Sequence, residues 1–494
     1  MAPTPLLFAS ALLLAAPHDQ GASPVVAQGG PPSARAVERE APPSRAEITR
    51  EELEHVLASL AADELEGRAT ASRGIRAAGD LLAERLRLAG VAPGGDEGTY
   101  FQAVPMVRAR SSAAPELALR QGETRRAFQL GVDYDIVAEP LAHKGLVVRF
   151  VDALERMPDA ADAGMALVLD GTAAQRREWL AAKGLGDGRG FGLIVARGQA
   201  KAGAARERLM SRLERVDKPS SRADQPVVLR ANASLLEALR QAEGALLEID
   251  TKVEKVREDC RNVVGLVEGV GSKDDPKLAE TALVLSAHYD HVGLDERAPP
   301  GADRVMNGAD DDASGCAMLA EIAGAIAGGP APARDVVFLF ATAEEIGLVG
   351  TEYHLDHPLA PLERTVANLN FEMVGRPDAK AGGAGWLWFT GHDRTNLHDA
   401  FAAAALSIAP DPYPDQMFFE RSDNYAFVKR GVVGQTFSSY NLHKDYHRVT
   451  DETALIDFAH LFEATKAALA AVRLVADGKV EPLWKPGRVP LRPR

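Results

Sequence analysis

The second half of the chain alternates short apolar runs with segments of helical periodicity. The runs are apolar along almost their whole length, which is typical of strands covered on both faces. Alternation of such strands with helices predicts an α/β fold with an open mixed, mostly parallel sheet and helices on both faces. The predicted strands are 262–268, 282–287, 335–341, 365–371, 386–390 and 432–437, and the helices are 314–326, 396–406 and segments from 348 and about 452.

Ligand-type side chains stand where the predicted strands give way to loops. Because an open α/β sheet gathers the carboxyl ends of its strands along one crevice, these side chains are expected to meet there. Two histidines and three carboxylates, with one spare glutamate, suit two zinc ions that share a carboxylate. The set consists of His288, an acid of the triplet Asp310–Asp312, the pair Glu344 and Glu345 with Glu344 left as a general base, Glu372 and His447.

Each of these residues has a simpler explanation when taken alone. A histidine at a strand end is more often structural, and Asp312 or Ser314 would serve as a helix cap. Capping accounts for one acid, whereas Asp310, Asp311 and Asp312 repel one another unless a cation or a helix N-terminus compensates. Five such positions in series favour a metal site. His291, next in the first of these stretches, is interpreted as a bystander.

Composition limits the class of protein and its partners. The 494 residues, 46% of them hydrophobic and 26% charged, indicate a globular chain of one large core or two to three domains. The net charge of -14 argues against a nucleic-acid partner, which would require a basic face. The two cysteines, Cys260 and Cys316, form no CxxC pattern, which excludes a cysteine metal site. Two buried thiols are favoured over a disulfide.

The N-terminus resembles an export signal. Pro5–Ala16 is an apolar run too short to span a bilayer, and small residues at 25–27 offer a cleavage site. The run lacks a preceding Lys or Arg, so a disordered apolar tail is the alternative. We therefore expect a signal peptide over 1–27, a flexible leader over 28–45 and a secreted or periplasmic protein without a membrane anchor.

The sequence pattern between residues 106 and 250 predicts an inserted domain. Short β-like runs at 145–151 and 165–169 and a helix at 234–242 are separated by polar, Gly-rich segments that contain no ligand-type cluster. We expect a smaller α+β domain over 106–250, inserted into a catalytic domain of residues 46–105 and 251–480. Residues 481–494 are expected to form a C-terminal tail.

Taken together, the motifs resemble those of the co-catalytic di-zinc aminopeptidases, relatives of glutamate carboxypeptidase, glutaminyl cyclase and the transferrin receptor. The motifs are Ser286–Asp290, Asn307–Gly315, Ala343–Glu345, Asn368–Met373 and Asp445–His447, with Asp63–Arg68 before them. The resemblance covers residues of about 46 to 105 and 255 to 475. By position and rough pattern, the insertion resembles a protease-associated domain.

The resemblance implies a role for each residue. His288 and Glu372 would bind one zinc, Glu345 and His447 the other, and Asp311 would bridge the two. The remaining roles concern catalysis: Glu344 would be the general base, Asp290 would orient His288, and Tyr446 and Arg421 would assist the oxyanion. Position 372 is Glu where the bacterial aminopeptidases have Asp, which changes the reach of the ligand oxygen.

The expected function is that of an exported di-zinc metallopeptidase that removes N-terminal residues from peptides with a free N-terminus. A carboxypeptidase or dipeptidase on the same scaffold is one alternative, although it requires a cluster of basic residues for the substrate carboxylate. A single-zinc glutaminyl cyclase and a non-catalytic binding protein are further alternatives, and the complete ligand set disfavours both. Oligomeric state and side-chain preference stay open.

Overall fold

The computed structural model describes residues 47–489 except 112–115, 139–142, 187, 189, 199–210, 218–226, 251–252 and 297. The predicted signal peptide (1–27) and leader (28–45) lie outside the described residues, as do 490–494 of the predicted tail. No helix in the described part of the chain combines the length and hydropathy needed to cross a membrane.

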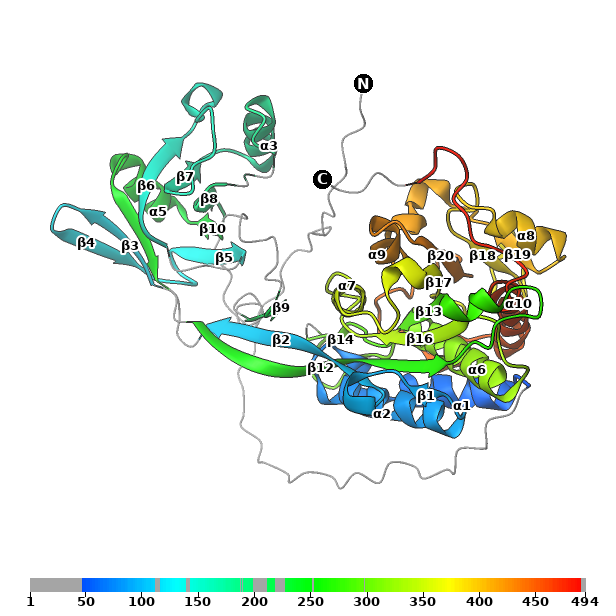
Figure 1. Cartoon of the computed structure of the whole chain (residues 1–494). Coiled ribbons are helices and arrows are strands. Elements are labelled where there is room, and N and C mark those ends of the chain that lie inside the picture. The colour runs from blue at the N-terminus through cyan, green and yellow to red at the C-terminus, as the bar shows by residue number, and fades with distance from the viewer. Residues whose placement is uncertain are drawn as a thin grey trace. The chain divides into compact units, whose positions relative to one another are not determined.

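A ten-stranded mixed sheet underlies the ligand-bearing segments (Figure 1). The four central strands β20, β17, β13 and β16 are mutually parallel, and antiparallel pairs flank them on both sides. The predicted mixed α/β sheet is therefore confirmed. In order, the strands are β19 (Ile408–Pro410), β18 (Leu387–Phe389), β20 (Val433–Ser438), β17 (Thr365–Phe371), β13 (Ala282–His288), β16 (Asp335–Ala341), β12 (Val253–Val267), β2 (Phe101–Ser111) and β9 (Ser211–Arg215), with β1 (Ala92–Pro93) paired to β12.

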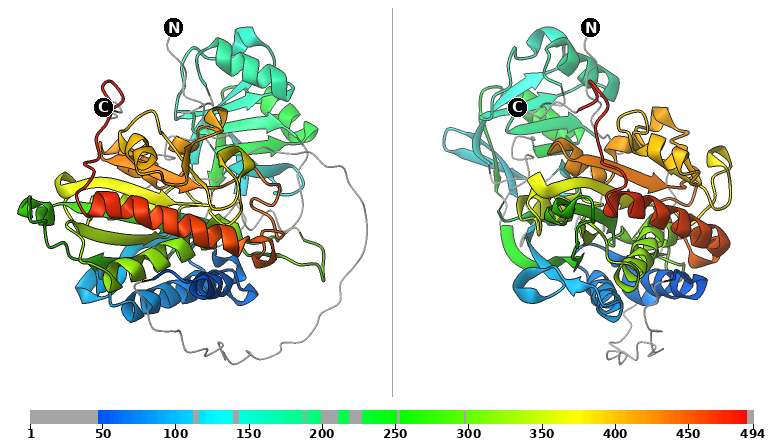
Figure 2. Two further views of the ribbon diagram at one scale, coloured as in Figure 1. Left: turned by 90° about the vertical axis from the view of Figure 1, so that its right-hand side faces the viewer. Right: turned by 45° about the vertical axis from the view of Figure 1, so that its right-hand side comes forward.

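Helices cover both faces of this sheet because successive side chains of a strand point to opposite sides. In β13, Leu283 and Leu285 pack into the larger core, while Val284 packs into the core of the other face. Figure 2 shows α10, α6 and α1 stacked on one side of the strands. The helices of the larger core are α1 (Arg50–Leu60), α2 (Arg73–Leu88), α6 (Gly315–Gly328) and α10 (Phe458–Ala476). The helices of the core on the opposite face are α7 (Val349–Asp356) and α9 (Asn424–Lys429). A further helix, α8 (Leu397–Ala403), lies beside β19.

A second sheet, of eight strands, lies within the predicted insertion. Its order is β4 (Thr124–Phe128), β3 (Glu116–Gln121), β11 (Leu246–Asp250), β6 (His143–Val151), β7 (Met165–Leu169), β8 (Leu193–Arg197), β10 (Val227–Ala231) and β5 (Tyr134–Ala138). The helices α3 (Ala173–Ala182) and α5 (Ala233–Gln241) belong to the same interval, whereas β9 pairs with β2 of the first sheet. The division at 106 and 250 stays a prediction.

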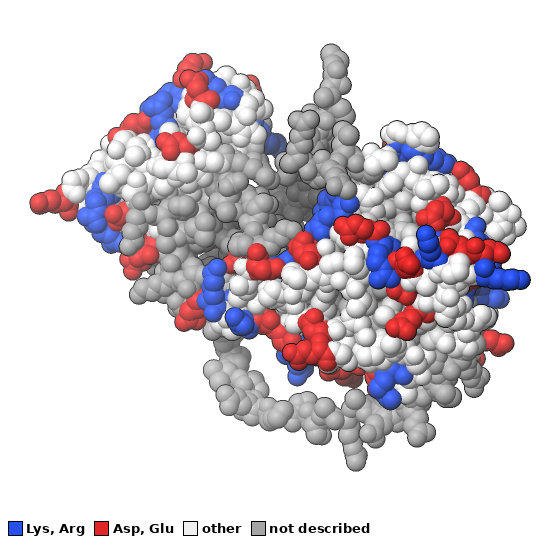
Figure 3. Space-filling view, in the orientation of Figure 1, with Lys and Arg blue, Asp and Glu red and all other residues white. Residues whose placement is uncertain are grey.

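Acidic and basic side chains are intermixed on the face of the molecule drawn in Figure 3. Several of the exposed charges form pairs, such as Arg87 with Glu84 at 2.6 Å. Exposed pairs of this kind contribute about 0–1 kcal/mol each, so they affect solubility more than the fold. In the interior, Cys260 and Cys316 are buried free thiols, as predicted.

A fully buried arginine, Arg68, joins the segments around the carboxyl end of β13. Its guanidinium donates hydrogen bonds to the carbonyl oxygens of Tyr289 (3.0 Å), Asn307 (2.6 Å), Gly308 (3.0 Å) and Leu60 (2.5 Å). A planar guanidinium reaches several acceptors at once, which the single ammonium group of lysine does not. Arg68 therefore fixes the loop after β13 relative to the loop before α6.

Replacing Arg68 by Met keeps the stem but removes a donor from four carbonyl groups. That of Gly308 retains the backbone N–H of Ala313 (3.2 Å), so the loss affects mainly those of Leu60, Tyr289 and Asn307. We expect Arg68→Met to lower the free energy of unfolding by more than about 3 kcal/mol, because each unsatisfied buried group costs about 1–3 kcal/mol. Urea denaturation measures this loss, and Arg87→Met, at an exposed site, serves as the control with an effect within about 0.5 kcal/mol. Equal stability of the two variants would show that Arg68 does not hold these loops.

Candidate metal centre

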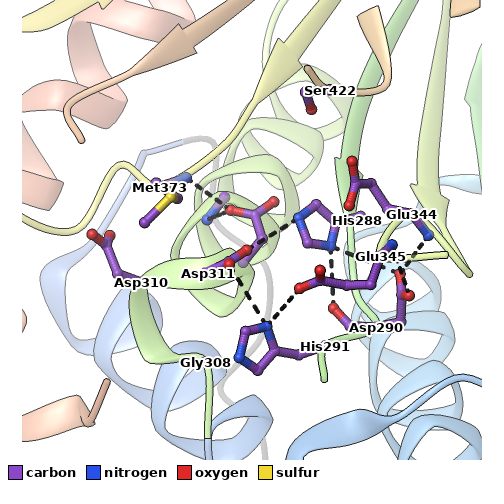
Figure 4. A network of polar contacts seen from close by, with 12 residues as sticks. His288, Asp290, His291, Gly308, Asp310, Asp311, Glu344, Glu345, Met373 and Ser422 are labelled. Atoms are coloured by element: carbon purple, nitrogen blue, oxygen red, sulfur yellow. Dashed lines mark hydrogen bonds and ion pairs between the residues drawn. The ribbon is translucent and has the colours of Figure 1, made fainter. Parts of the chain in front are cut away.

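The parallel strands bring predicted ligands together at their carboxyl ends, and Figure 4 shows His288, Asp311 and Glu345 close to one another. His288 is the last residue of β13, and Glu372 follows the last residue of β17. Glu344 and Glu345 follow β16, on the other side of β13. The remaining two ligands come from Asp311, in the turn before α6, and from His447, in the loop after β20.

Asp311 lies between the two predicted histidine ligands. Its Oδ1 is 3.3 Å from Nε2 of His288, and its Oδ2 is 3.2 Å from Nε2 of His447. Nε2 of His447 is also 3.2 Å from Oε2 of Glu345. One carboxylate with a different histidine at each oxygen is the arrangement expected of a ligand shared by two metal positions.

The three adjacent aspartates point in different directions and serve different purposes. Asp312 accepts a hydrogen bond from the backbone N–H of Gly315 (3.1 Å) in the first turn of α6, as a helix cap would. Asp310 accepts one from the backbone N–H of Gly375 (2.7 Å). Asp311 turns toward His288 and His447, whereas Asp310 lies 3.0 Å from Nε2 of another histidine, His443, so separate partners relieve the mutual repulsion of the triplet.

Asp290 supports the site through both its side chain and its backbone. Its carboxylate accepts hydrogen bonds from the backbone N–H groups of Glu344 (3.0 Å) and Glu345 (3.3 Å). Nδ1 of His288 lies 3.1 Å from the carbonyl oxygen of Asp290 and 3.7 Å from its carboxylate. The predicted contact with His288 thus involves mainly the carbonyl group, and the carboxylate holds the loop that carries the two glutamates.

The histidines and the acids between them stabilise each other's charged forms. Burial disfavours the charge on His288, but the nearby carboxylates of Glu344 and Asp311 outweigh it and raise the pKa of His288 well above its usual value. For Glu345 burial works against ionisation as well, yet His291 and His447 lower its pKa to about 2. Opposite charges within a few ångströms therefore dominate here.

Glu344 and Glu372 behave differently because fewer positive groups face them. Burial raises the pKa of Glu344 well above its usual value, and Glu372 and Glu345 add to this by repulsion. Burial likewise raises the pKa of Glu372, to about 7. Two carboxyl groups that resist ionisation beside a cluster of ligands mark a place where a cation would be stabilising.

The donor atoms fit a metal ion by their chemistry as well as by their positions. Several of them are buried and lack a hydrogen-bond partner within the described protein, which is costly unless something else binds them. Imidazole nitrogen and carboxylate oxygen are the ligand types that zinc takes in catalytic sites. The atoms concerned are Nε2 of His288, Oδ2 of Asp311, Oε2 of Glu372 and Nε2 of His447.

His291, interpreted from the sequence as a bystander, lies inside the cluster. Its Nδ1 is 2.9 Å from Oε1 of Glu345 and 3.7 Å from Oδ2 of Asp311 (Figure 4). One ligand atom from each of His291, Asp311, Glu345 and His447 falls within a single group whose members all lie within 4.8 Å of one another. The signal in the sequence was a second histidine three residues after His288, beyond the end of the same strand.

The two residues predicted to assist catalysis line the same pocket as the acids. The ring of Tyr446 stacks on that of His447, with centroids 3.9 Å apart and an angle of 20° between the planes. Arg421 is exposed, and its guanidinium lies 5.2 Å from the ring centre of Phe418. Both side chains are therefore placed beside the cluster without belonging to its ligands.

Aromatic side chains line part of this pocket, beside Met373 and several serines and threonines, and sequence patterns did not indicate them. Trp388 and Phe418 stack with centroids 5.3 Å apart, and Tyr440 meets Phe418 edge to face at 5.9 Å. They come from β18, from a turn before α9 and from the loop after β20. These segments are far apart in the sequence, and only folding places their side chains along one side of the pocket.

A buried network of hydrogen bonds and ion pairs next to Asp311 was not predicted from the sequence. The carboxylate of Asp451 accepts hydrogen bonds from the backbone N–H groups of Asp310 (3.0 Å) and Asp311 (3.1 Å). Arg376 donates to Asp451 (2.7 Å) and to Asp445 (2.8 Å). The network ties the loop that carries His447 to the segment that carries Asp311.

Left-handed backbone conformations of residues other than glycine gather next to the site. Such conformations cost about 1–2 kcal/mol for a residue with a Cβ atom, and they concentrate where function requires a particular geometry. Six of the eleven such residues in the described part of the chain lie within a few residues of a predicted ligand or a pocket-lining side chain. They occur at Ala343 (φ 59°), Leu348 (φ 59°), Met373 (φ 50°), Met417 (φ 53°), Leu442 (φ 60°) and His447 (φ 54°).

Curated proteins match the ligand-bearing part of the chain. A vacuolar membrane protease of Yarrowia lipolytica is 30% identical over 190 residues, which are 38% of this chain and 17% of that protein. The aminopeptidase YwaD of Bacillus subtilis is 29% identical over 147 residues, which are 29% of this chain and 28% of that protein. The chain thus spans less than a third of the length of these relatives.

A solved structure agrees with the fold. The aminopeptidase from Aneurinibacillus sp. strain AM-1 superposes with a TM-score of 0.51 at 18% identity, covering 90% of this chain and 97% of that one. The model of peptidase family M28 matches residues 262–472, an interval that contains the five predicted ligands and Glu344. The family resemblance is confirmed: residues 262–472 of this chain match the model of peptidase family M28.

Proposed function

We propose that this protein is an exopeptidase with two zinc ions that removes N-terminal residues from peptides. The observation that carries the proposal is the position of Asp311 between His288 and His447, at one end of a pocket that Glu344 also lines. Similarity to proteins named aminopeptidase supports the same reading. The finer points, namely two metals, the free N-terminus and export, are proposals that the following experiments test.

In this proposal His288 and Glu372 hold one zinc, Glu345 and His447 hold the other, and Asp311 is shared. Bound zinc would polarise the scissile carbonyl and lower the pKa of a water molecule. The partnerless nitrogen and oxygen atoms of these side chains support the assignment. Glu372, the residue that departs from the aspartate of relatives, keeps an oxygen donor at the end of β17.

Glu344 is proposed as the general base. It lines the pocket and follows β16 directly beside the ligand Glu345, and its backbone N–H is held by Asp290 at 3.0 Å. Glu344 accepts a proton from the attacking water and delivers it to the nitrogen of the leaving amine. Tyr446 and Arg421 lie in the same pocket, and their O–H and N–H groups would stabilise the negative charge that develops on the carbonyl oxygen.

Arg421 also supports a second candidate, a carboxypeptidase on the same scaffold. Within the described residues it is the one cation that lines the pocket, and it forms no ion pair there. A single exposed arginine that lies over the ring of Phe418 is a weak anchor for a terminal carboxylate, which favours the aminopeptidase. Cleavage of C-terminally amidated peptides with loss of activity on N-acetylated ones distinguishes the two functions.

Export stays part of the proposal, supported by the apolar run at Pro5–Ala16. The N-terminal sequence of the protein recovered from a secreting host would begin near Gln28 if the run is a cleaved signal. Recovery of the chain with Met1 intact would contradict export by this route.

Replacing Glu344 by Gln removes the proton acceptor and keeps the size of the side chain. We expect Glu344→Gln to lower kcat on aminoacyl anilides by about 10²–10⁴-fold. Metal content, measured by elemental analysis of the same samples, should stay at the wild-type value because Glu344 is not a ligand. Near-normal turnover would place the general base elsewhere, and a loss of metal would make Glu344 a ligand.

The aromatic wall of the pocket generates a prediction about the cleaved residue. We expect a preference for large apolar N-terminal side chains, which Trp388, Phe418 and Tyr440 would enclose. Phe418→Ala should reduce kcat/KM for leucyl or phenylalanyl anilide relative to alanyl anilide by about tenfold or more. Val270→Ala, at a site that is 69% exposed, is the control. An unchanged ratio would place the specificity pocket elsewhere.

A further inference from the structure

We propose that His291 is a fourth protein ligand of the second metal position, together with Asp311, Glu345 and His447. That position would then be closed, with four protein ligands and no place for a substrate atom. The open coordination would belong to the first position, with His288, Asp311 and Glu372. This inference rests on the proposed zinc peptidase function, and the experiment below separates the two.

The four side chains approach one another closely enough to share one metal ion. With metal–ligand bonds of about 2.0–2.2 Å, neighbouring donors of a tetrahedron lie about 3.3–3.6 Å apart. His447 Nε2 is 3.2 Å from both Asp311 Oδ2 and Glu345 Oε2, while His291 Nδ1 is 3.7 Å from Asp311 Oδ2 and 2.9 Å from Glu345 Oε1. Two of these distances use different oxygens of Glu345, and with one ligand atom from each residue the four atoms all lie within 4.8 Å of one another, so they gather around one point.

The ring of His291 is held in place from several directions. Its side chain is fully buried, and its backbone N–H donates to the carbonyl oxygen of Arg68 at 3.1 Å. Gly308, in a left-handed conformation with φ +57°, leaves room for the ring, because a Cβ atom there would lie 2.6 Å from its Cδ2. The ring of His447 meets that of His291 edge to face at 5.4 Å. An imidazole locked in this way is a preorganised ligand.

Within the described residues, the group of four candidate donors is the one at the second position, and the first position has no group of this kind. His288, Asp311 and Glu372 are its donors, and Glu372 lines the pocket together with the general base Glu344. Catalytic zinc sites keep a coordination place open for water or substrate, whereas sites with four protein ligands do not. A closed second position would thus direct substrate and water to the metal nearest Glu344.

The competing interpretation makes His291 a positioning residue. In that case Nδ1–H donates a hydrogen bond to Oε1 of Glu345, at the 2.9 Å seen here, and orients this ligand without touching the metal. The two interpretations differ in what the side chain must supply. A ligand needs an imidazole nitrogen, whereas the hydrogen bond needs only a donor.

Two variants of the full-length protein separate these roles. His291→Asn keeps an N–H donor near the position of Nδ1 but removes the imidazole, and His291→Ala removes both. Zinc affinity is measured by competition with a chromophoric chelator, and His55→Ala, on α1 away from the site, is the control. A ligand role predicts that Asn and Ala weaken one of the two zinc sites alike, by more than about 100-fold, and leave the other measurable.

A crystal structure of the zinc-loaded wild-type protein at the zinc absorption edge provides the direct readout. Nδ1 of His291 within about 2.1 Å of a zinc ion would support the proposal. Two zinc ions with His291 hydrogen-bonded to Glu345 only, or wild-type affinity in the Asn variant, would overturn it. A wild-type protein that binds no zinc would instead refute the proposed function on which the inference rests.

Discussion

Crowding of carboxylates in a partly enclosed space is the constraint on which the rest of this structure depends. Asp311, Glu344, Glu345 and Glu372 all line one pocket. Like charges at such separations destabilise one another by several kcal/mol unless cations compensate. The imidazoles supply part of this compensation. Burial lowers the pKa of His447, but the carboxylates of Asp311 and Glu345 outweigh burial and raise this pKa to about 10. Metal ions would supply the remainder.

Holding repelling groups together requires a rigid frame, and the chain builds it from backbone hydrogen bonds. Asp290 fixes the loop of the two glutamates, and Asp451 with Arg376 fixes the segment of Asp311. Arg68 joins the loops on either side of the first histidine. Because these supports use carbonyl and N–H groups, they place the ligands without competing for the metal.

The two sides of the site differ in charge because of the same geometry. The side of the cluster near His447 is rich in imidazole and holds its acids ionised, whereas the side near Glu344 and Glu372 is poor in positive charge. The aromatic wall and Arg421 border the same pocket. In the proposed mechanism, substrate binding and proton transfer would therefore take place on the side where the protein itself leaves negative charge uncompensated.

The sequence by itself determined the fold class and most of the donors. Near-continuous apolar strands ending in polar residues led to the mixed sheet, because strand period and strand-end position are local properties of the chain. The roles of His288, Asp311 and His447 came from the family resemblance, and the geometry is consistent with them.

Tertiary structure alone decided the rest. His291, Arg376 and the wall of Trp388 and Phe418 gave no periodic signal, because their role depends on contacts between segments far apart in the sequence. Asp290 was named from the resemblance as the partner of His288, but only the fold shows that its carboxylate contacts the backbone of residues 344–345, more than fifty residues away. Which donor a side chain meets is set by how the loops pack, and local sequence carries no record of that packing.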